Sequence, residues 1–178
     1  KVEEPGTALV PARVTADFVR DLQGETVKLR TKGDTFEIQS GGDKCELTTV
    51  DPDEYPVVAR FSDEGSFSLT GGTFTRLVAR TGFAAAREAG RYAMHGILTE
   101  LDGDEIRMVA TDGRRLVLAS SAVEDRAPAL KRAIVPTKGM QLFCKVIDDP
   151  TEVVRIHFGE NQFGLRTGKA EVYRRLID

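Results

Sequence analysis

An internal repeat constrains the fold of this chain more than any other feature of its sequence. The segment LVPAR at residues 9–13 returns as IVPTK at residues 134–138, about 125 residues later. A helical pattern follows each segment, and three short runs with strand-like alternation follow each helix. These runs are residues 26–30, 35–39 and 44–48 in the first copy and residues 153–157, 162–166 and 170–174 in the last.

A third copy lies between these two. Residues 66–70 alternate as a short strand, residues 73–81 have a helical pattern, and residues 94–101, 105–111 and 114–120 alternate as strands do. The turn at residues 102–104 suits a tight hairpin, because its central glycine tolerates a positive φ. Each copy is therefore predicted to be a strand, a helix and three antiparallel strands, which is an α+β fold. Pro11 and Pro136 are predicted at the first helical position, where the missing N–H costs nothing.

The spacing of the copies predicts two domains. Residues 1–61 hold one copy, and residues 62–178 hold two, which we expect to form one complete domain. Residues 49–62, with Pro52 and Pro56, are predicted to be the connector, and residues 121–129 a polar loop. Because the chain begins without Met and ends at its last predicted strand, we expect it to be part of a longer protein.

Charge and cysteine usage narrow the classes of function. The formal net charge is -3, whereas a dedicated DNA-coating protein is usually strongly basic. A DNA partner therefore requires the basic residues to gather on one surface. Cys45 and Cys144 form neither a CxxC nor a zinc pattern, which favours a reduced, cytoplasmic setting. No signal peptide is visible in this sequence, and because it contains no run of 18 or more apolar residues, we expect no membrane span.

Each predicted helix carries two basic residues away from its apolar stripe. Acidic residues on these helices are limited to Asp17 and Asp21. A basic face shared by three helices suits phosphate contacts that do not depend on base sequence. Two other interpretations stay open: an ordinary solvated helix face, and a structural repeat protein without a nucleic-acid partner, in which basic residues would be scattered. The basic pairs are Arg13 and Arg20, Arg76 and Arg80, and Lys138 and Lys145.

Catalytic chemistry has little support in the sequence. A hydrolase or transferase on a duplicated scaffold is an alternative, but it needs a convergent nucleophile, base and oxyanion donors. His95 and His157 lie on separate strand-like runs and are interpreted as structural or exposed. Residues 164–170 are similar to a phosphate-binding loop, but the spacing is one residue short and Ala170 replaces the required Ser or Thr. They are predicted to form a hairpin turn.

Clustered carboxylates are interpreted as turn residues. Asp102, Asp104 and Glu105 lack the spacing of a calcium loop, so a solvated turn is predicted there. Asp112 is predicted to accept hydrogen bonds from backbone N–H groups of its own turn. We therefore expect no enzyme activity, no metal and no cofactor.

Four segments resemble the bacterial DNA sliding clamp family, the β subunit of DNA polymerase III. The most specific is VATDGRRL at residues 109–116, which follows two predicted hairpin strands. GFAAA at residues 82–86, followed by RYAMHG at residues 91–96, resembles the family's central segment. IVPTKG at residues 134–139 and VPAR at residues 10–13 add two matches. The resemblance covers essentially the whole chain, as the second half of the family's first domain and most of its second.

The resemblance implies the DNA-clamp fold, in which antiparallel sheets form the outside of a ring and helices line its central hole. It implies a homodimeric ring that encircles double-stranded DNA, slides along it and confers processivity. The implied partners are the polymerase III catalytic subunit, the clamp loader and other proteins with a clamp-binding motif. The residues implied to face DNA are Arg13, Arg20, Arg76, Arg80, Arg87, Arg91, Tyr92, Lys138 and Lys145.

The resemblance also implies a groove for a short hydrophobic peptide of each partner. Relative to the family pattern, Met94 replaces Leu, which keeps the groove apolar, and Arg114 replaces His, which would favour acidic peptide residues. The rest of the groove belongs to the family's third domain, so this chain alone is expected to bind such peptides poorly. The implied groove residues are Met94, Thr111, Gly113, Arg114, Arg115 and Leu116.

Two further assignments come from the resemblance. Phe18, Leu22, Lys44 and Cys45 correspond to the edge at which two clamp subunits meet. Phe18 and Leu22 also lie on an apolar helix stripe, so burial in a core is an open alternative. Tyr92 lies in a loop that approaches DNA in the family, and partial packing into the core is its alternative.

Overall fold

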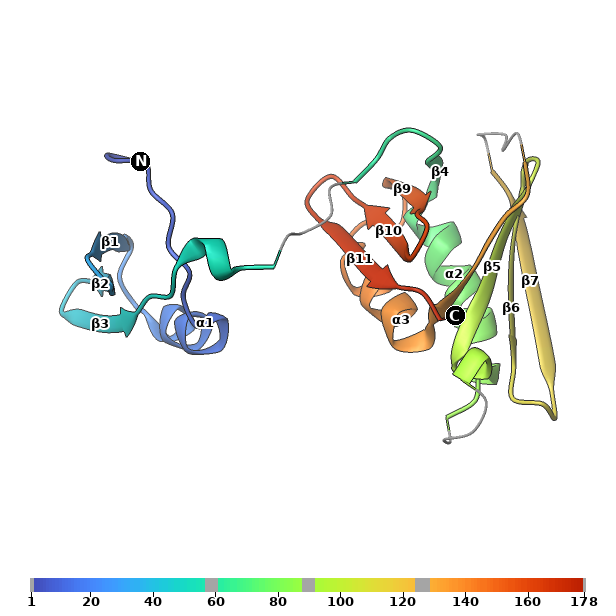
Figure 1. The fold of residues 1–178 in the computed structure, drawn as a ribbon, viewed down its shortest axis with the longest axis horizontal. Helices are drawn as coiled ribbons and strands as arrows, with labels where there is room; N and C mark the ends of the chain where they lie inside the picture. The colour runs from blue at the N-terminus through green and yellow to red at the C-terminus, as the bar shows by residue number, and fades with distance from the viewer. Residues whose placement is uncertain (1, 57–60, 88–91, 124–128, 178) are drawn as a thin grey trace. The chain divides into compact units, whose positions relative to one another are not determined.

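The computed structural model of the chain describes residues 2–56, 61–87, 92–123 and 129–177 (Figure 1). The chain divides into two compact units, Lys1–Val58 and Ala59–Asp178. Among the described residues, no helix is both long and apolar enough to cross a membrane.

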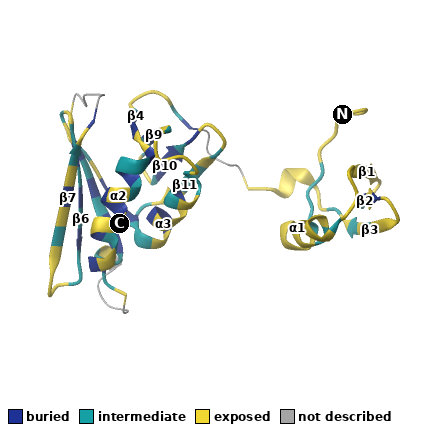
Figure 2. Cartoon of the chain, turned by 180° about the vertical axis from the view of Figure 1, so that it is seen from behind, coloured by how far each residue is buried: buried dark blue, intermediate teal, exposed yellow. Residues whose placement is uncertain are grey.

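The first unit contains one copy of the repeat, in which a helix precedes a three-stranded antiparallel sheet with the order β1-β2-β3. An isolated bridge joins Leu9 to Val50. Ile38 of β2 is fully buried, but α1 has no buried residue, and Figure 2 draws this helix almost entirely as exposed. The elements are α1 (Ala12–Asp21), β1 (Lys28–Lys32), β2 (Thr35–Ser40), β3 (Asp43–Thr48) and the short helix η1 (Pro52–Glu54).

The second unit contains two copies, and the predicted order of strand, helix and three antiparallel strands is confirmed in both. The first copy is β4 (Phe67–Thr70), α2 (Gly71–Thr81), β5 (Gly96–Asp102), β6 (Glu105–Thr111) and β7 (Leu116–Ala122), with the short helices η2 (Gly82–Ala84) and η3 (Tyr92–His95) before β5. The second copy is β8 (Lys131–Pro136), α3 (Thr137–Lys145), β9 (Val153–Phe158), β10 (Gln162–Arg166) and β11 (Glu171–Arg175).

The two copies exchange their leading strands. The sheet orders are β11-β10-β9-β4 and β7-β6-β5-β8, so β4 joins the three strands of the second copy and β8 joins those of the first. Leu69 of β4 lies opposite Val154 of β9, and Val135 of β8 lies opposite Ile97 of β5. Neither sheet is complete without the other copy.

Aromatic side chains join the two helices to the sheets in one core. The ring of Phe74 on α2 lies edge-on to that of Phe143 on α3, with 6.4 Å between centroids. Phe143 also contacts Phe163 of β10 at 5.6 Å between centroids. Phe74, Phe143 and Phe163 are fully buried, so α2 and α3 are held side by side.

The start of α2 was predicted two residues too late. Gly71 and Gly72 belong to the helix, and their N–H groups donate to the carbonyls of Glu152 and Pro150 at 2.7 and 2.8 Å. A Cβ atom on Gly71 would lie 2.5 Å from Cγ2 of Ile147. The glycines let the helix start against the loop of the second copy, a close approach that local sequence does not reveal.

Other boundaries also differ from the prediction. Pro11 and Pro136 are N-cap residues with extended ψ, one position before the predicted one. Met94 lies in η3 because β5 begins at Gly96, which is paired with Pro136 of β8. Proline has no N–H to extend that ladder. The first strand is Lys28–Lys32, not residues 26–30, and β7 extends into the predicted loop as far as Ala122.

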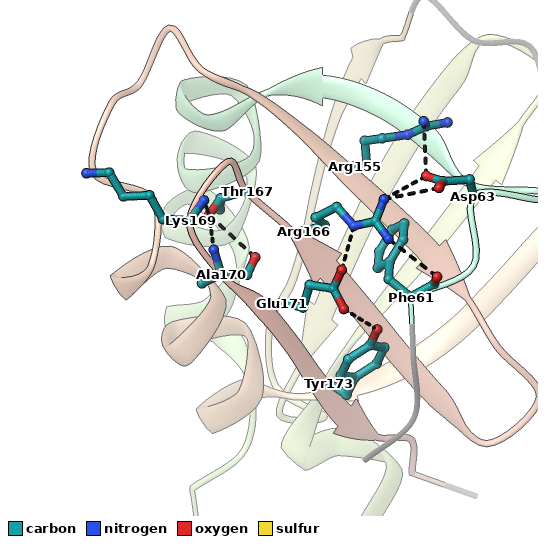
Figure 3. Close-up of polar contacts among 9 residues, drawn as sticks. All are labelled: Phe61, Asp63, Arg155, Arg166, Thr167, Lys169, Ala170, Glu171 and Tyr173. Atoms are coloured by element: carbon teal, nitrogen blue, oxygen red, sulfur yellow. Dashed lines mark hydrogen bonds and ion pairs between the residues drawn. The ribbon is translucent and has the colours of Figure 1, made fainter. Parts of the chain in front are cut away.

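The end of the connector is fastened to the second unit (Figure 3). Phe61 is only 7% exposed, and the guanidinium carbon of Arg166 lies 4.3 Å from its ring centroid. Arg166 bonds Asp63 at 2.9 Å and Glu171 at 2.8 Å. Burial, followed by the hydrogen bond to Glu171, raises the pKa of Tyr173 to about 12. This cluster anchors the chain where it enters the second unit.

We expect Phe143→Ala to lower the free energy of unfolding of the second unit by about 3–5 kcal/mol, because it empties space between both helices and a sheet. Urea unfolding followed by circular dichroism measures the loss. Leu142→Ala is the matched control on α3, since Leu142 is 46% exposed, and a change under about 0.5 kcal/mol is expected. Equal losses in the two variants would contradict this description of the core.

Candidate nucleic-acid interface and partner groove

The second unit presents four of the predicted DNA-facing residues on two adjacent helices. Arg76 and Arg80 on α2 and Lys138 and Lys145 on α3 are all exposed. Within the described parts of the chain, Arg80, Lys138 and Lys145 form no ion pair, and Arg76 donates only to the hydroxyl of Thr73 at 3.0 Å. No carboxylate among the described residues therefore neutralises the charges of these four side chains, here called the helix cations.

The basic pair of the first unit is arranged differently. Arg13 and Arg20 on α1 lie on either side of Asp17, with N–O distances of 3.9 and 3.1 Å. All three are well exposed, so the ion pairs are weak and open to competition from other anions. Asp17 therefore neutralises part of the positive charge of this helix face, and a net positive charge remains.

The remaining predicted DNA contacts lie around residues 87–92. Arg87 is exposed at the end of the described segment that follows η2. Arg91 and the side chain of Tyr92 lie outside the described residues.

The residues predicted to form the partner groove lie around the turn between β6 and β7. The hydroxyl of Thr111 accepts a hydrogen bond from the N–H of Gly113 at 3.0 Å and donates one to the carbonyl of Arg115 at 2.7 Å. Leu116 lies opposite Thr111 in the strand ladder and is 66% exposed. A Cβ atom on Gly113 would lie 3.9 Å from the sulfur of Met94. The structure therefore brings these residues together beside η3.

Asp112 organises this turn. One carboxylate oxygen accepts hydrogen bonds from the N–H groups of Arg114 and Arg115, both at 3.0 Å, and the other bonds the Arg115 side chain at 3.0 Å. The prediction that Asp112 bonds its own turn is confirmed. These bonds also remove Arg114 and Arg115 from the strand predicted at residues 114–120, because Asp side chains compete with strand ladders for backbone groups.

Phe83 is a residue of this region to which the sequence prediction assigned no role. Arg115 donates to the Phe83 carbonyl at 3.2 Å, and its guanidinium carbon lies 5.7 Å from the Phe83 ring centroid. Phe83 is 49% exposed. The one sequence feature that could have indicated a role for Phe83 is its large aromatic side chain in a segment rich in glycine and alanine. Arg115 therefore links the turn between β6 and β7 to η2, the short helix that follows α2.

The predicted subunit edge lies in the first unit. Phe18 and Leu22 are half-buried, so α1 does not bury them fully in the described unit. Cys45 is half-buried opposite Ile38. Lys44 bonds Glu37 and Glu46, both at 2.8 Å, and these carboxylates raise the pKa of its ammonium group. Both α1 and the edge strand β3 thus retain surface for a further contact.

Comparison with known proteins identifies the family of the chain. Residues 68–178 match the profile of the DNA polymerase III beta subunit, central domain, and residues 1–59 match the profile of its N-terminal domain. The chain belongs to the DNA polymerase III beta subunit family. Among curated relatives, the beta sliding clamps of Salmonella typhimurium and Escherichia coli K12 are 32% and 31% identical over 176 residues, which is 98% of this chain. The chain spans about half the length of these relatives, 48% in each case.

Solved beta subunits have the same fold. The DNA polymerase III beta subunit of Pseudomonas aeruginosa superposes on the whole chain with a TM-score of 0.93 at 28% identity, and the match covers 49% of that subunit. The Bacillus subtilis sliding clamp gives a TM-score of 0.95 at 24% identity, which supports the fold alone. A further Pseudomonas aeruginosa clamp of this family was solved bound to griselimycin. The predicted clamp fold is confirmed.

The segment of this beta-subunit chain that is similar to a phosphate-binding loop is a hairpin turn, as predicted. Residues 162–166 and 171–175 are paired strands. The Thr167 hydroxyl accepts hydrogen bonds from the N–H groups of Lys169 and Ala170 at 3.2 and 3.0 Å (Figure 3). Within the described residues, no group of three or more His, Cys, Asp or Glu side chains is placed to hold a metal ion.

The pKa of Asp112 is held below its ordinary value, first by the N–H of Arg114 and then by that of Arg115. Because the folded-state pKa is lowered, the stabilisation of the turn is present above the unfolded-state pKa and is lost as pH falls through the folded value. We expect the amide signals of Arg114 and Arg115 to titrate with a common midpoint below that of Asp in an unfolded peptide, as measured by NMR. In Asp112→Asn this titration should vanish. Persistence of the titration would assign it to another group.

Proposed function

We propose that this chain is a portion of a DNA sliding clamp. Such a clamp is a ring that encircles double-stranded DNA and tethers the replicative polymerase. The observation that carries the proposal is the set of helix cations on α2 and α3, which have no carboxylate partner among the described residues of a net-acidic chain. This gathering favours a nucleic-acid partner over a repeat protein with scattered charge. On this proposal, Lys1–Val58 is the second half of the first clamp domain and Ala59–Asp178 is the central domain.

A clamp does not need to grip DNA tightly, because closure of the ring prevents escape. Contacts from Arg and Lys side chains to phosphates are independent of sequence and weaken as salt rises. Exposed, flexible cations on helices suit such contacts, since each can exchange one phosphate for the next. We infer that the helix cations, with Arg13, Arg20, Arg87, Arg91 and Tyr92, face the central hole and permit sliding.

The proposed clamp acts by binding and not by catalysis. The turn between β6 and β7, with Met94 beside it, would hold the hydrophobic peptide of a polymerase, a clamp loader or another partner. Exposed Leu116 supplies apolar surface, and Arg114 adds positive charge at the rim. We propose that this binding needs no cofactor and takes place in the cytoplasm.

The subunit edge is proposed to include Phe18, Leu22, Lys44 and Cys45. The position of Lys44 and Cys45 on β3, an edge strand of its sheet, supports this assignment. Two subunits joined in this way would form a homodimeric ring.

The decisive test is topological. We expect the full-length clamp, loaded on nicked circular DNA, to stay bound in high salt and to be lost when the circle is linearised, as measured by gel filtration of the DNA. Salt-resistant retention that ends on linearisation means linkage to the circle. Loss from the intact circle in high salt means simple electrostatic binding and contradicts the clamp proposal.

The same assay has a second arm. Arg76→Glu combined with Arg80→Glu should lower loading roughly tenfold at moderate salt, because two phosphate contacts become repulsive. The fold should persist, since both side chains are exposed. Arg132→Glu is the matched control, because Arg132 is an exposed cation on strand β8. Equal loading of all three proteins would remove α2 from the DNA-facing surface.

We expect Leu116→Ala in the full-length clamp to weaken binding of a partner peptide roughly tenfold, because the exposed leucine loses its contact with an apolar anchor. Isothermal titration calorimetry measures the change. Leu118→Ala is the control, since Leu118 is 56% exposed on the same strand face two residues away. Unchanged affinity in Leu116→Ala would exclude this residue from the groove.

A further inference from the structure

A pocket of about 790 Å³ lies between α2 and α3, and two of the helix cations, Lys138 and Lys145, line it. This volume falls within the range of small-molecule sites and can contain a nucleotide. The apolar part of its wall comes from Val78 and Ala79 of α2, Phe83 of η2 and Cys144 of α3. Burial raises the pKa of the Cys144 thiol, which therefore stays uncharged at neutral pH.

The rim of this pocket is cationic. Arg87, Lys138, Lys145 and Arg174 contribute to it, and the described lining residues include no Asp or Glu. None of these four side chains forms an ion pair within the part of the chain that the structure describes. An apolar wall beneath an unpaired cationic rim fits a ligand with a flat apolar body and a negative charge at its edge.

Arg174 reaches this rim from the edge strand β11 because of one glycine. It lies opposite buried Phe163 in the ladder, so its side chain is on the helix side of the sheet. A Cβ atom on Gly139 of α3 would lie 2.5 Å from Cγ of Arg174. The stem of Arg174 therefore crosses α3 at Gly139, and any larger residue there would displace it. Gly139, the residue next to Lys138, thus allows Arg174 to join the other cations at the pocket.

We propose that this pocket takes an unpaired base of DNA, with the flanking phosphates held by the cationic rim. The inference rests on the proposed clamp function and adds to it the kind of DNA that the inner surface prefers. Half-exposed Phe83 offers an aromatic side chain for stacking, which is tolerant of base identity. Gln141 and Thr75 supply polar groups in the pocket lining that can meet the edge of a base. A duplex with one unpaired base is therefore bound more tightly than a fully paired duplex.

The test compares two duplexes of equal length and equal phosphate number. In one, 2-aminopurine lies opposite thymine and is paired; in the other, it lies opposite an abasic site and is unpaired. The 178-residue chain contains no Trp, so 2-aminopurine fluorescence is read without interference from the protein. At low ionic strength, we expect roughly five- to tenfold tighter binding of the unpaired duplex, the gain of one stacked base, together with a change in its fluorescence.

A pocket-filling variant separates the pocket from the surrounding charge. Ala79 is exposed on α2 and lines the pocket, so Ala79→Phe fills the space without altering the core or any cation. We expect this variant to bind both duplexes equally, with the affinity for the paired duplex unchanged. Leu142→Phe is the matched control, because Leu142 is exposed on α3 outside the pocket, and it should keep the preference.

Each outcome decides between the two proposals. Equal affinity of the unaltered chain for both duplexes overturns the pocket inference and leaves the clamp function standing. A preference that survives in Ala79→Phe also overturns it, because the unpaired base must then bind elsewhere. Failure to bind either duplex at low salt overturns DNA binding itself. A third result would assign the pocket to a protein ligand: a dye-labelled acidic peptide binds the unaltered chain but not Ala79→Phe, and the unaltered chain shows no preference for the unpaired duplex.

Discussion

Exchange of the leading strands β4 and β8 is the interaction on which the rest of the second unit depends. Each strand completes the sheet of the other copy, so neither copy can bury its apolar face alone. The exchange holds α2 and α3 together through Phe74 and Phe143.

The same packing separates paired carboxylates on the strands and turns from cations on the helices, in a chain whose net charge is negative. Carboxylates on strands and turns are engaged locally: Glu105 bonds Arg107 at 2.6 Å, and Asp112 bonds its own turn. The cations on α2 and α3 have no such partner among the described residues, so their field extends into solvent. Local neutralisation of acid leaves a positive surface on the helices even though the total charge is negative, and phosphate binding requires only that surface.

Prediction from sequence succeeded where one local pattern dominates. Strands at residues 105–111 and 162–166 were placed correctly to the residue, because turn residues bound both runs in the sequence. It failed where a distant contact or a side chain competes with the local pattern. The Asp112 carboxylate draws the N–H groups of Arg114 and Arg115 out of the predicted strand, and the loop at Glu152 extends α2 back to Gly71. The role of Phe83 was missed because its contact with Arg115 spans 32 residues.

The sequence by itself determined the repeat, the α+β class, the family and the basic pairs, because all of these are written in short-range periodicity or in local motifs. Only the tertiary structure decided which sheet each leading strand joins, since β4 and β8 have the same strand pattern whichever copy they pair with. It alone decided that Arg174 crosses α3 at Gly139 to reach the pocket. Contacts of this kind depend on the packing of whole elements, and such packing leaves no period in the chain that sequence reasoning can detect.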